Sequence, residues 1–451
     1  MSAPQSALSP ANEPVRGYRR LLISPTMAVL FVTVFLSVAG FSLPSPVFAP
    51  LLLEPQSGFF PLSVTDVERK IWLGVLIAVY PLLQLFGAPW LGRMSDRYGR
   101  KSMLLLSLLG VAAGYLVMAL GMAQHSLLVM LLGRMIEGWF CGNVAIAQAM
   151  AADISSHEER PRHFALLSIA MNLGWVVGPI IGGYVASWTG EFSMVGWLAA
   201  GLVLLNALFA QLALQEGQRT VVSSDPDITP SVPQQGNWQL LVAAHLRPLF
   251  ILTVLSYATV QLYFTYFNMW LVDRFTYSPV ELAHCAVLVS VPMMLGSWLG
   301  SRMASRFDNT TLGIVGHSVM ALGVLLFIFP EQLWGLALTF LPAGIGMTIG
   351  ELATAVAVSK AASARQQGQA MGLCRGLTVA CEILAVALGS MLVIFNVALT
   401  FVLAALFSAL CALGFLRLRR QQAQPQVSEL LLRRHIPRVL WKDVGLERKG
   451  E

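Results

Sequence analysis

The sequence predicts an all-α membrane protein in which twelve transmembrane helices form two pseudo-symmetric six-helix bundles. The 451 residues are 56% hydrophobic and only 12% charged, with a mean hydropathy of +0.69. A soluble domain of this size carries about twice that share of charge. Apolar runs of about 18 residues or more recur along the whole chain, as membrane-spanning helices require. One polar segment near the middle divides these runs into two sets of six.

The apolar runs give twelve candidate spans, and only a short turn around Pro330 and Glu331 separates the ninth from the tenth. The first span contains Pro44, Pro46 and Pro50. Because proline removes a helical hydrogen bond, these residues predict a broken or kinked helix. In chain order the spans are 27–53, 71–93, 103–122, 127–152, 163–187, 192–214, 246–272, 280–303, 311–329, 332–357, 367–392 and 395–417.

The segment 215–245 is rich in Ser, Pro, Gln and Asp, which is typical of a linker. It separates an N-terminal bundle, 27–214, from a C-terminal bundle, 246–417. The polar N-terminal tail, 1–26, lacks the apolar core of a signal peptide, so we expect the first span to stay in the mature protein. The basic C-terminal tail, 418–451, is expected to be a solvated anchor against anionic headgroups.

The distribution of basic residues predicts the orientation of the chain. With both termini in the cytoplasm, 24 of the 29 Lys and Arg residues lie in tails and loops on the cytoplasmic side. Two lie inside spans, and the opposite side holds only Arg69, Lys70 and Arg274. Because cytoplasmic loops retain Lys and Arg, this asymmetry favours a multi-pass protein with both termini in the cytoplasm. We expect it in the cell inner membrane. The asymmetry also accounts for the net charge of +6 without a nucleic-acid partner.

The loop between the second and third spans is the most distinctive stretch of the chain. Residues 92–101 read Gly-Arg-Met-Ser-Asp-Arg-Tyr-Gly-Arg-Lys, with five charges and two glycines in ten positions. We predict a tight basic turn that forms a cytoplasmic hinge. A fainter copy, Met303–Phe307, follows the second span of the second half and favours two parallel structural repeats.

Three motifs resemble those of the major facilitator superfamily. Residues 92–101 match its G-x-(L/M)-(S/A)-D-R-x-G-R-(K/R) signature, and Leu132–Gly138 is similar to its intramembrane arginine motif. Gly174–Gly183 in the fifth span resembles the G-x3-G-P-x2-G-G element of twelve-span drug/proton antiporters. The stretch 80–187 looks most like tetracycline-type exporters. The resemblance therefore rests on sequence motifs in the first half, and mainly on the arrangement of six spans in the second half.

The resemblance implies that the turn gates the cytoplasmic side. Asp96 is expected to meet the positive N-terminus of the eleventh span, near Gly368 and Gln369 in the other half. Gly92 and Gly99 are expected to permit close approach or a positive φ. The alternative is that Asp96 only solvates a loop. The residues of this gating motif are Gly92, Asp96, Arg97, Gly99, Arg100 and Lys101.

Three glycines in the fifth span, Gly174, Gly178 and Gly182, recur every four residues and so line one helix face. A face without side chains lets a neighbouring helix pack backbone against backbone, and Pro179 permits a bend. By resemblance to the exporters, this face, together with Gly183, is expected to seal the contact between the halves on the outward side. Ordinary tight packing is the alternative.

Charged side chains at membrane depth need a partner or water. Arg134 and Glu137 are three residues apart and can pair on one helix face. The functional hypothesis is proton coupling, with Glu137 as the first candidate carrier, Glu351 as the second and Glu382 as the third. The alternative is local ion pairs that only fix helix register. Tetracycline-type antiporters carry an acid in the first span, whereas 27–53 has none, so we assign no carrier there.

Polar and aromatic residues mark a candidate solute site. Tyr257, Gln261 and Asn268 recur near helical spacing in the seventh span. Aromatic and amide groups suit amphipathic solutes, and interhelical hydrogen bonding is the alternative role. The residues assigned to the substrate cavity are Tyr257, Gln261, Asn268, Asn143 and Arg375. Further candidates are Tyr80, Gln84, Gln148, Tyr263 and Tyr266.

By this resemblance we expect a secondary active transporter, in first place a proton-coupled exporter (antiporter) of small amphipathic organic solutes or drugs by alternating access. The alternatives are an exporter of a carboxylate-bearing metabolite such as a siderophore, a metabolite uptake symporter, and a membrane receptor or scaffold. The sequence shows no nucleotide-binding glycine loop, metal cluster or Ser/His/Asp order, which disfavours an enzyme and direct ATP drive. No cofactor is expected. The expected partners are a small molecule, protons and the lipid bilayer, and the chain is expected to be a monomer.

Overall fold

The computed structural model describes residues 24–156, 159–214, 241–243, 246–304, 306–362 and 367–435. Within these ranges the regular structure is helical, without strands. Twelve helical segments of the described part of the chain are long and apolar enough to cross a membrane. The prediction of an all-α membrane protein with twelve spans is therefore confirmed.

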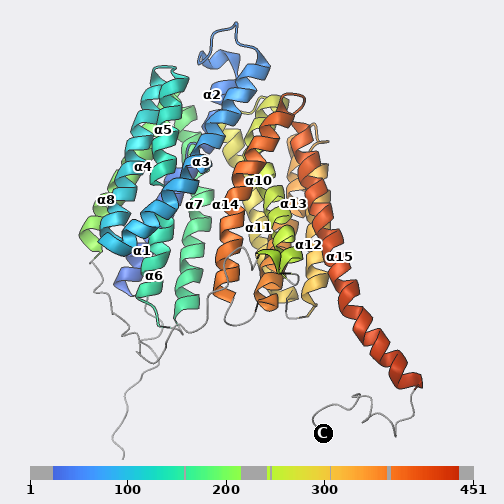
Figure 1. Cartoon of the computed structure of the whole chain (residues 1–451). Coiled ribbons are helices and arrows are strands. Elements are labelled where there is room, and N and C mark those ends of the chain that lie inside the picture. Colours follow the sequence, from blue (N-terminus) through green and yellow to red (C-terminus); the bar gives the residue numbers. More distant parts are fainter. Residues whose placement is uncertain are drawn as a thin grey trace, which may run out of the picture.

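The first half of the chain forms one group of helices, coloured blue to green in Figure 1. In chain order they are α1 (Pro25–Ser42), α2 (Ser45–Leu53), the short helix η2 (Pro55–Ser57), α3 (Asp66–Tyr98), α4 (Arg100–Ala123), α5 (Leu127–Phe140), α6 (Asn143–Asp153), α7 (Arg160–Thr189) and α8 (Ser193–Ala213). Within this group α1 packs against α7, and α4 packs against both α5 and α8.

The second half forms the other group, coloured yellow to red in Figure 1. Its helices are α10 (Arg247–Phe275), α11 (Pro279–Met303), α12 (Asn309–Leu326), α13 (Leu333–Ala361), α14 (Gln367–Val393) and α15 (Ala398–His435). α12 packs against α13 and α15, and α10 packs against α14 and α15. The halves meet where α7 packs on α11 and α3 packs on α14.

The twelve spans give the bundle two distinct ends. Because the number of spans is even, α1 begins and the last span ends on the same side. We call the opposite side, which carries the turns after α2, α4, α7, α10, α12 and α14, the distal end. The ninth and tenth spans, α12 and α13, are separated by 327–332 at this end, so the predicted split around Pro330 is confirmed.

Side-chain caps set where several helices begin. Thr65 and Glu68 form a capping box at the start of α3, and Ser278 and Glu281 form another at the start of α11. Asp308 caps α12 by accepting a hydrogen bond from Thr311 N at 3.1 Å. Hydrogen bonds from the hydroxyls of Thr310 and Thr311 lower the pKa of Asp308 to about 2.

The first span is broken, as its prolines predict. α1 ends at Ser42 and α2 begins at Ser45, with Leu43 and Pro44 between them. Pro44 has no backbone N–H to donate, which favours interruption of the helix at this point. The prediction of a broken or kinked first helix is confirmed.

The fourth span is also broken, between α5 and α6, and this break was not predicted. Cys141 and Gly142 separate the two helices. The side chain of Ser107 in α4 supplies hydrogen bonds at the gap: its Oγ donates to Phe140 O at 2.6 Å and accepts from Gly142 N at 3.3 Å. A tertiary partner thus adds to the hydrogen bond that Gly142 N donates to Phe140 O at 2.9 Å within the break.

The predicted turn at 92–101 is wrong in extent. Helix α3 continues to Tyr98 and α4 begins at Arg100, so Gly99 alone separates them. Gly99 has a φ of 101°, a conformation that residues with a Cβ rarely adopt. The expected positive φ is therefore confirmed at Gly99. A Cβ at Gly92 would meet no atom within 4 Å, and Gly92 has no positive φ, so the expectation for Gly92 is wrong.

The last predicted span, 395–417, agrees with the candidate membrane span Ala398–Gln421, but the helix that contains it is longer. α15 continues from Ala398 to His435 and therefore extends into the basic tail. Figure 1 shows this helix projecting beyond the rest of its group. An apolar span followed by a charged continuation is consistent with a helix that leaves the hydrocarbon region.

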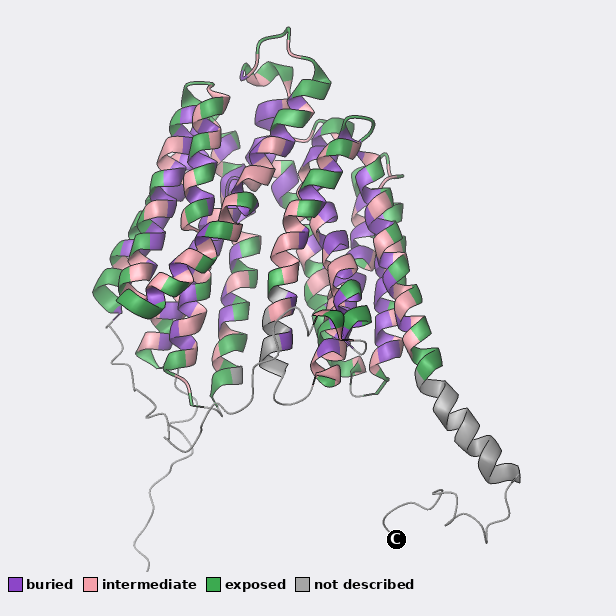
Figure 2. Cartoon of the chain, in the orientation of Figure 1, coloured by how far each residue is buried: buried purple, intermediate pink, exposed green. Residues whose placement is uncertain are grey.

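Large apolar side chains are exposed along the outside of the bundle. Leu128, Leu205 and Leu338 are 78%, 57% and 63% exposed. Figure 2 shows exposed positions along the outer helices and buried ones where helices meet. Such exposure suits contact with lipid tails, which are as apolar as leucine.

Candidate functional site

A buried ion pair lies inside the fourth span. Arg134 Nη1 donates to Glu137 Oε2 at 2.6 Å, and the two residues are 5% and 1% exposed. The prediction that these residues pair on one helix face is confirmed. Arg134 Nε and Glu137 Oε1 have no hydrogen-bond partner among the described residues. Each charge therefore keeps unused hydrogen-bonding capacity at membrane depth.

Aromatic rings surround the ion pair. The Arg134 guanidinium carbon lies 4.6 Å from the ring centre of Tyr80 on α3 and 5.4 Å from that of Phe48 on α2. Ring faces attract a cation, so they hold the guanidinium without a further carboxylate. Tyr115 on α4 lies close enough to Glu137 to interact with it electrostatically, but its hydroxyl does not reach hydrogen-bonding geometry.

Two glycines let three helices close around this pair. A Cβ at Gly138 would lie 2.4 Å from Tyr80 O, and a Cβ at Gly114 would lie 2.7 Å from Glu137 N. Both distances are far shorter than a van der Waals contact. Helices α3, α4 and α5 can therefore approach backbone to backbone only with glycine at these positions.

Cys141, in the break of the fourth span, links the ion-pair region to the second half. Tyr80 Oη lies 2.5 Å from Cys141 Sγ, and Gln84 Nε2 donates to the same sulfur at 3.5 Å. Glu382 on α14 is close enough to interact electrostatically with Cys141. The third candidate carboxylate thus lies near the break, whereas Glu351 lies half-buried on α13. The side chain of Arg375 lies outside the described ones.

The predicted polar face of the seventh span is present on α10. Tyr257, Gln261 and Asn268 are all half-buried. Asn268 Nδ2 donates to Ser45 O at 2.8 Å, which joins α10 to the start of α2 in the other half. Asn268 therefore contributes to the contact between the halves.

Two tyrosines near this face belong to the core. Tyr263 is fully buried, and its ring packs 5.5 Å from Phe267 and 5.2 Å from Phe327. Tyr266 is also buried, and its hydroxyl donates to Val386 O at 2.6 Å. The expectation that these two line the solute site is wrong, since both point into helix packing.

The polar residues of the fourth span are engaged within the first half. Asn143 is 5% exposed, and its Oδ1 accepts from Val144 N at 2.9 Å at the start of α6. Gln148 Nε2 lies 3.7 Å from Met171 Sδ on α7. Both side chains therefore stabilise α6, one at its start and one against its neighbour.

The charged motif at the end opposite the distal end forms a network within the first half. Arg100 pairs with Asp96 at 2.7 Å and with Asp153 of α6 at 3.1 Å. Lys101 Nζ donates to Gln211 O of α8 at 2.8 Å. Arg97 lies over the Tyr98 ring at 5.3 Å. The side chains of 368 and 369, the predicted partners of Asp96, lie outside the described ones.

The glycine face of the fifth span does not contact the second half, contrary to expectation. A Cβ at Gly178 would lie 2.0 Å from Ser42 Oγ, and one at Gly182 would lie 1.9 Å from Leu43 O, both on or next to α1. Gly174 likewise packs against α1. These three residues seal α7 against its own half because their spacing points them all toward α1.

Gly183, one position further along, does contact the second half. A Cβ there would lie 2.5 Å from Pro279 O at the start of α11. Next to it, Tyr184 Oη lies 2.9 Å from His284 Nε2 on α11. Pro179 is buried on α7. Of the glycine motif, Gly183 is therefore the residue that joins the halves at the distal end.

Some contacts between the halves were not predicted. Lys70 on α3 and Asp273 on α10 form an ion pair at the distal end. The sequence held one signal for this pair: few basic residues lie at the distal end, so a lysine there indicates a specific partner. Within the first half, the ring contact between Trp175 on α7 and Phe41 on α1, with 5.4 Å between ring centres, was not predicted either.

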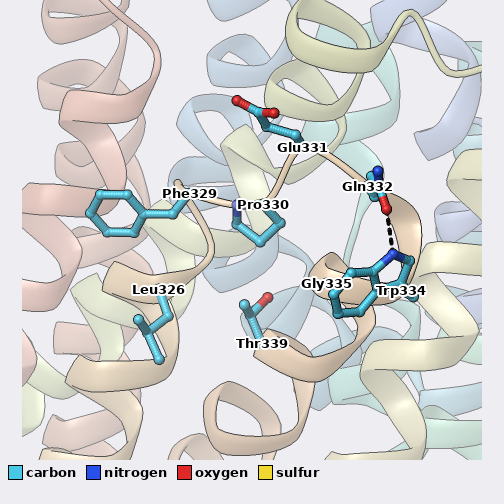
Figure 3. A pocket seen from close by; sticks show the side chains of 8 residues that line it. All are labelled: Leu326, Phe329, Pro330, Glu331, Gln332, Trp334, Gly335 and Thr339. Carbon is cyan, nitrogen blue, oxygen red and sulfur yellow. Dashed lines mark hydrogen bonds between the residues drawn. The ribbon is translucent and has the colours of Figure 1, made fainter.

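A shallow pocket lies at the distal end between α12 and α13, away from all these residues. Figure 3 shows Trp334 and Gln332 on one side and Phe329 on the other, with Trp334 Nε1 donating to Gln332 Oε1. None of the predicted site residues lines it. Within the described ranges, no three His, Cys, Asp or Glu side chains are grouped to hold a metal ion.

Comparison with known sequences finds a superfamily of transporters. The sequence profile of the Major Facilitator Superfamily matches residues 30–373 and 249–448. The class B tetracycline resistance protein of Escherichia coli is 29% identical over 363 residues, which cover 79% of this chain and 85% of that protein. The quinolone resistance protein NorA of Staphylococcus aureus is 25% identical over 256 residues, covering 56% and 61%.

Comparison with solved structures finds the same fold. The nucleoside transporter NupG has a TM-score of 0.66 at 15% identity, over 87% of this chain and 98% of that one. The human organic anion transporter MFSD10 has a TM-score of 0.60 at 21% identity, over 87% and 99%. At these identities the likeness shows the fold alone.

Proposed function

This chain belongs to the major facilitator superfamily and is a multi-pass membrane transporter, not an enzyme, and from that premise we propose that it exports small amphipathic organic solutes or drugs in exchange for protons. We place it in the cell inner membrane with both termini in the cytoplasm. The observation that carries the proposal is the buried pair of Arg134 and Glu137. The names of the tetracycline and quinolone resistance relatives support drugs as solutes.

The ion pair supplies the coupling in this proposal. Glu137 has one carboxylate, which either pairs with Arg134 or carries a proton. A change in water access to α5 therefore lets Glu137 exchange its pairing with Arg134 for a proton, or the reverse. An antiporter requires such an exchange. While Glu137 carries a proton, Tyr80 and Phe48 retain the guanidinium of Arg134 on their ring faces. Glu351 and Glu382 remain the second and third candidate carriers.

An alternating-access transporter opens to one side of the membrane at a time, so this structure corresponds to one of its states. The polar contacts between the halves described above, from Asn268 to Ser45 and from Tyr184 to His284, lie toward the distal end. In the proposed orientation that end faces away from the cytoplasm. We therefore assign the structure to a state closed to the outside.

Transport in proteoliposomes with an imposed pH gradient tests this function. Purified full-length chain is reconstituted and assayed with tetracycline, norfloxacin, a siderophore and a sugar. We expect accumulation of tetracycline or norfloxacin against its gradient, driven by the pH difference. Accumulation that depends on a membrane voltage and not on the pH difference would overturn proton antiport. Transport of the siderophore alone would favour the metabolite exporter.

A further inference from the structure

Helix α7 exposes a polar stripe in addition to an apolar one. Ser168 and Asn172 are exposed, and Trp175 is 50% exposed, on one side of the helix. Ile169 and Leu173 are exposed on the neighbouring side. In a membrane span the apolar stripe suits lipid, whereas polar side chains turn to the protein interior or to water. Two exposed stripes therefore imply two different surroundings.

The polar stripe belongs to the face that meets the second half. Asn172, Pro179 and Gly183 are spaced by seven and four residues and so share this face. Gly183, at the distal end of the face, packs on Pro279 of α11. Further from the distal end the same face is exposed. Trp175 therefore lies where the two halves are no longer in contact, further from the distal end than the contact of Gly183 with Pro279.

A chain of ring contacts leads from Trp175 to the ion pair. Trp175 packs edge-on against Phe41 of α1 with 5.4 Å between ring centres and 85° between planes. Phe41 lies 4.9 Å from Tyr80. Tyr80 in turn carries the guanidinium of Arg134 at 4.6 Å, and Arg134 pairs with Glu137. Only two rings separate an exposed tryptophan from the buried charges.

We propose that Trp175 contacts the aromatic part of the transported solute, and that Phe41 and Tyr80 are positioning residues that connect this contact to the Arg134–Glu137 pair. The inference rests on the proposed function and names the class of solute as one with a flat aromatic ring. Rings pack favourably edge-on or offset, so a half-exposed indole offers a ready partner. Close packing transmits a small displacement of one ring to the next.

The connection also explains why the ring of Tyr80 matters apart from its hydroxyl. The hydroxyl contacts Cys141, whereas the ring face contacts Arg134. Loss of the hydroxyl leaves both ring contacts of the guanidinium in place, whereas loss of the Tyr80 ring leaves only the longer contact with Phe48. The two contacts can therefore be separated by substitution.

The test measures KM, kcat and proton movement for tetracycline in proteoliposomes of the full chain. We expect W175L to raise KM about tenfold with kcat within about twofold, and W175F to recover KM to within about threefold, because a single ring retains stacking. W188L is the matched control, since Trp188 lies on the same helix near the distal end and is 91% exposed. It should leave both constants unchanged.

The second arm tests positioning. Y80L should leave KM within about threefold, lower kcat at least tenfold and abolish tetracycline-driven proton movement, whereas Y80F should keep the coupling. If Y80L does not reach the membrane, F41L breaks the same chain one ring earlier. A wild-type KM in W175L, or equal losses in Y80L and Y80F, overturns this inference alone. A wild-type chain that does not move tetracycline overturns the proposed function with it.

Discussion

Lys70 Nζ lies 2.5 Å from Asp273 Oδ1 and joins α3 of the first half to α10 of the second at the distal end. The two side chains are 18% and 32% exposed, so water screens the pair only in part. Asn268 lies on the same helix as Asp273 and reaches Ser45 in the other half. We call the Lys70–Asp273 contact the distal ion pair.

Reversal of one charge in the distal ion pair should open the distal end. K70E places two carboxylates side by side, and like charges repel at this distance. We expect the rate of tetracycline efflux to fall at least fivefold, because the outward-closed state loses a contact between the halves. The swap K70D/D273K should recover at least half of the rate. Efflux from proteoliposomes measures both.

The control for the distal ion pair is a second ion pair at the same end. Arg274 and Glu331 lie 3.9 Å apart and belong to one half. Their contact does not cross between the halves, so E331K should change efflux less than twofold. Equal effects of K70E and E331K, or no recovery in the swap, would contradict a role in closure.

Substitution of Glu137 should uncouple transport from protons. E137Q cannot exchange a proton, so tetracycline should no longer accumulate against its gradient. It also leaves the buried Arg134 without a counter-charge, and breaking one side of a buried pair destabilises by about 3–5 kcal/mol. R134Q/E137Q removes both charges and should be more stable than either single variant. Thermal unfolding in detergent measures this order.

The control for Glu137 is Glu191, an exposed acid in the turn between α7 and α8. E191Q should transport like the wild type. If E137Q still accumulates tetracycline with unchanged dependence on pH, Glu137 is not the carrier and Glu351 is the next residue to test.

The glycine face of α7 should tolerate no side chain. In G182A the new Cβ would lie 1.9 Å from Leu43 O, and backbone cannot move aside as a flexible side chain can. Overpacking of this kind costs about 1–3 kcal/mol. G201A in α8 is the matched control, since a Cβ there meets nothing within 4 Å. It should be neutral or stabilising, and a similar loss in both variants would refute this packing.

The junction between α3 and α4 should require Gly99. Its φ of 101° is strained for any residue with a Cβ, so G99A should cost about 1–3 kcal/mol. G92A, seven residues earlier and inside α3, should be neutral or stabilising because alanine favours helix. The melting temperatures of the two variants in detergent test this difference, and their equality would show that the junction relaxes.

The cap of α12 should give a stability that depends on acid pH. The folded pKa of Asp308 is about 2, below the ordinary value of 3.8. The charged form therefore stabilises the fold above about pH 4, and this contribution is lost as the pH falls toward 2. D308A should be less stable at neutral pH by about 1 kcal/mol. Its deficit should shrink between pH 4 and pH 2.

D308N is the control for the cap, since an amide oxygen still accepts from the helix but does not titrate. Its difference from D308A should not change with pH. A deficit of D308A that stays constant down to pH 2 would show that the charge of Asp308 does not contribute.

Local chemistry allowed much of the fold to be predicted. The twelve apolar runs predict the twelve spans because hydrocarbon demands long helices with satisfied backbone. Pro44 predicts the break after α1 because it lacks an N–H. The break at Cys141 and Gly142 was not predicted because Ser107, whose side chain bonds to the backbone there, comes from another helix.

The candidate site, like the fold, was predicted only in part. Arg134 and Glu137 were predicted to pair because three residues along a helix bring side chains together. The partners of Gly178 and Gly182 were predicted in the wrong half, since spacing defines a face but not the neighbour that covers it. Trp175 occupies an unspecified position of the Gly174–Gly183 element, so its contact with Phe41 could not be read from the motif.

The sequence by itself determined how many times this protein crosses the membrane, which charges lie in the spans and which of them pair within one turn. These properties depend on composition and on contacts a few residues apart. Only the tertiary structure decided that Lys70 meets Asp273, that α7 packs on α1, and that rings from three helices lead to Arg134. Such contacts join distant residues, and the packing of whole helices selects them.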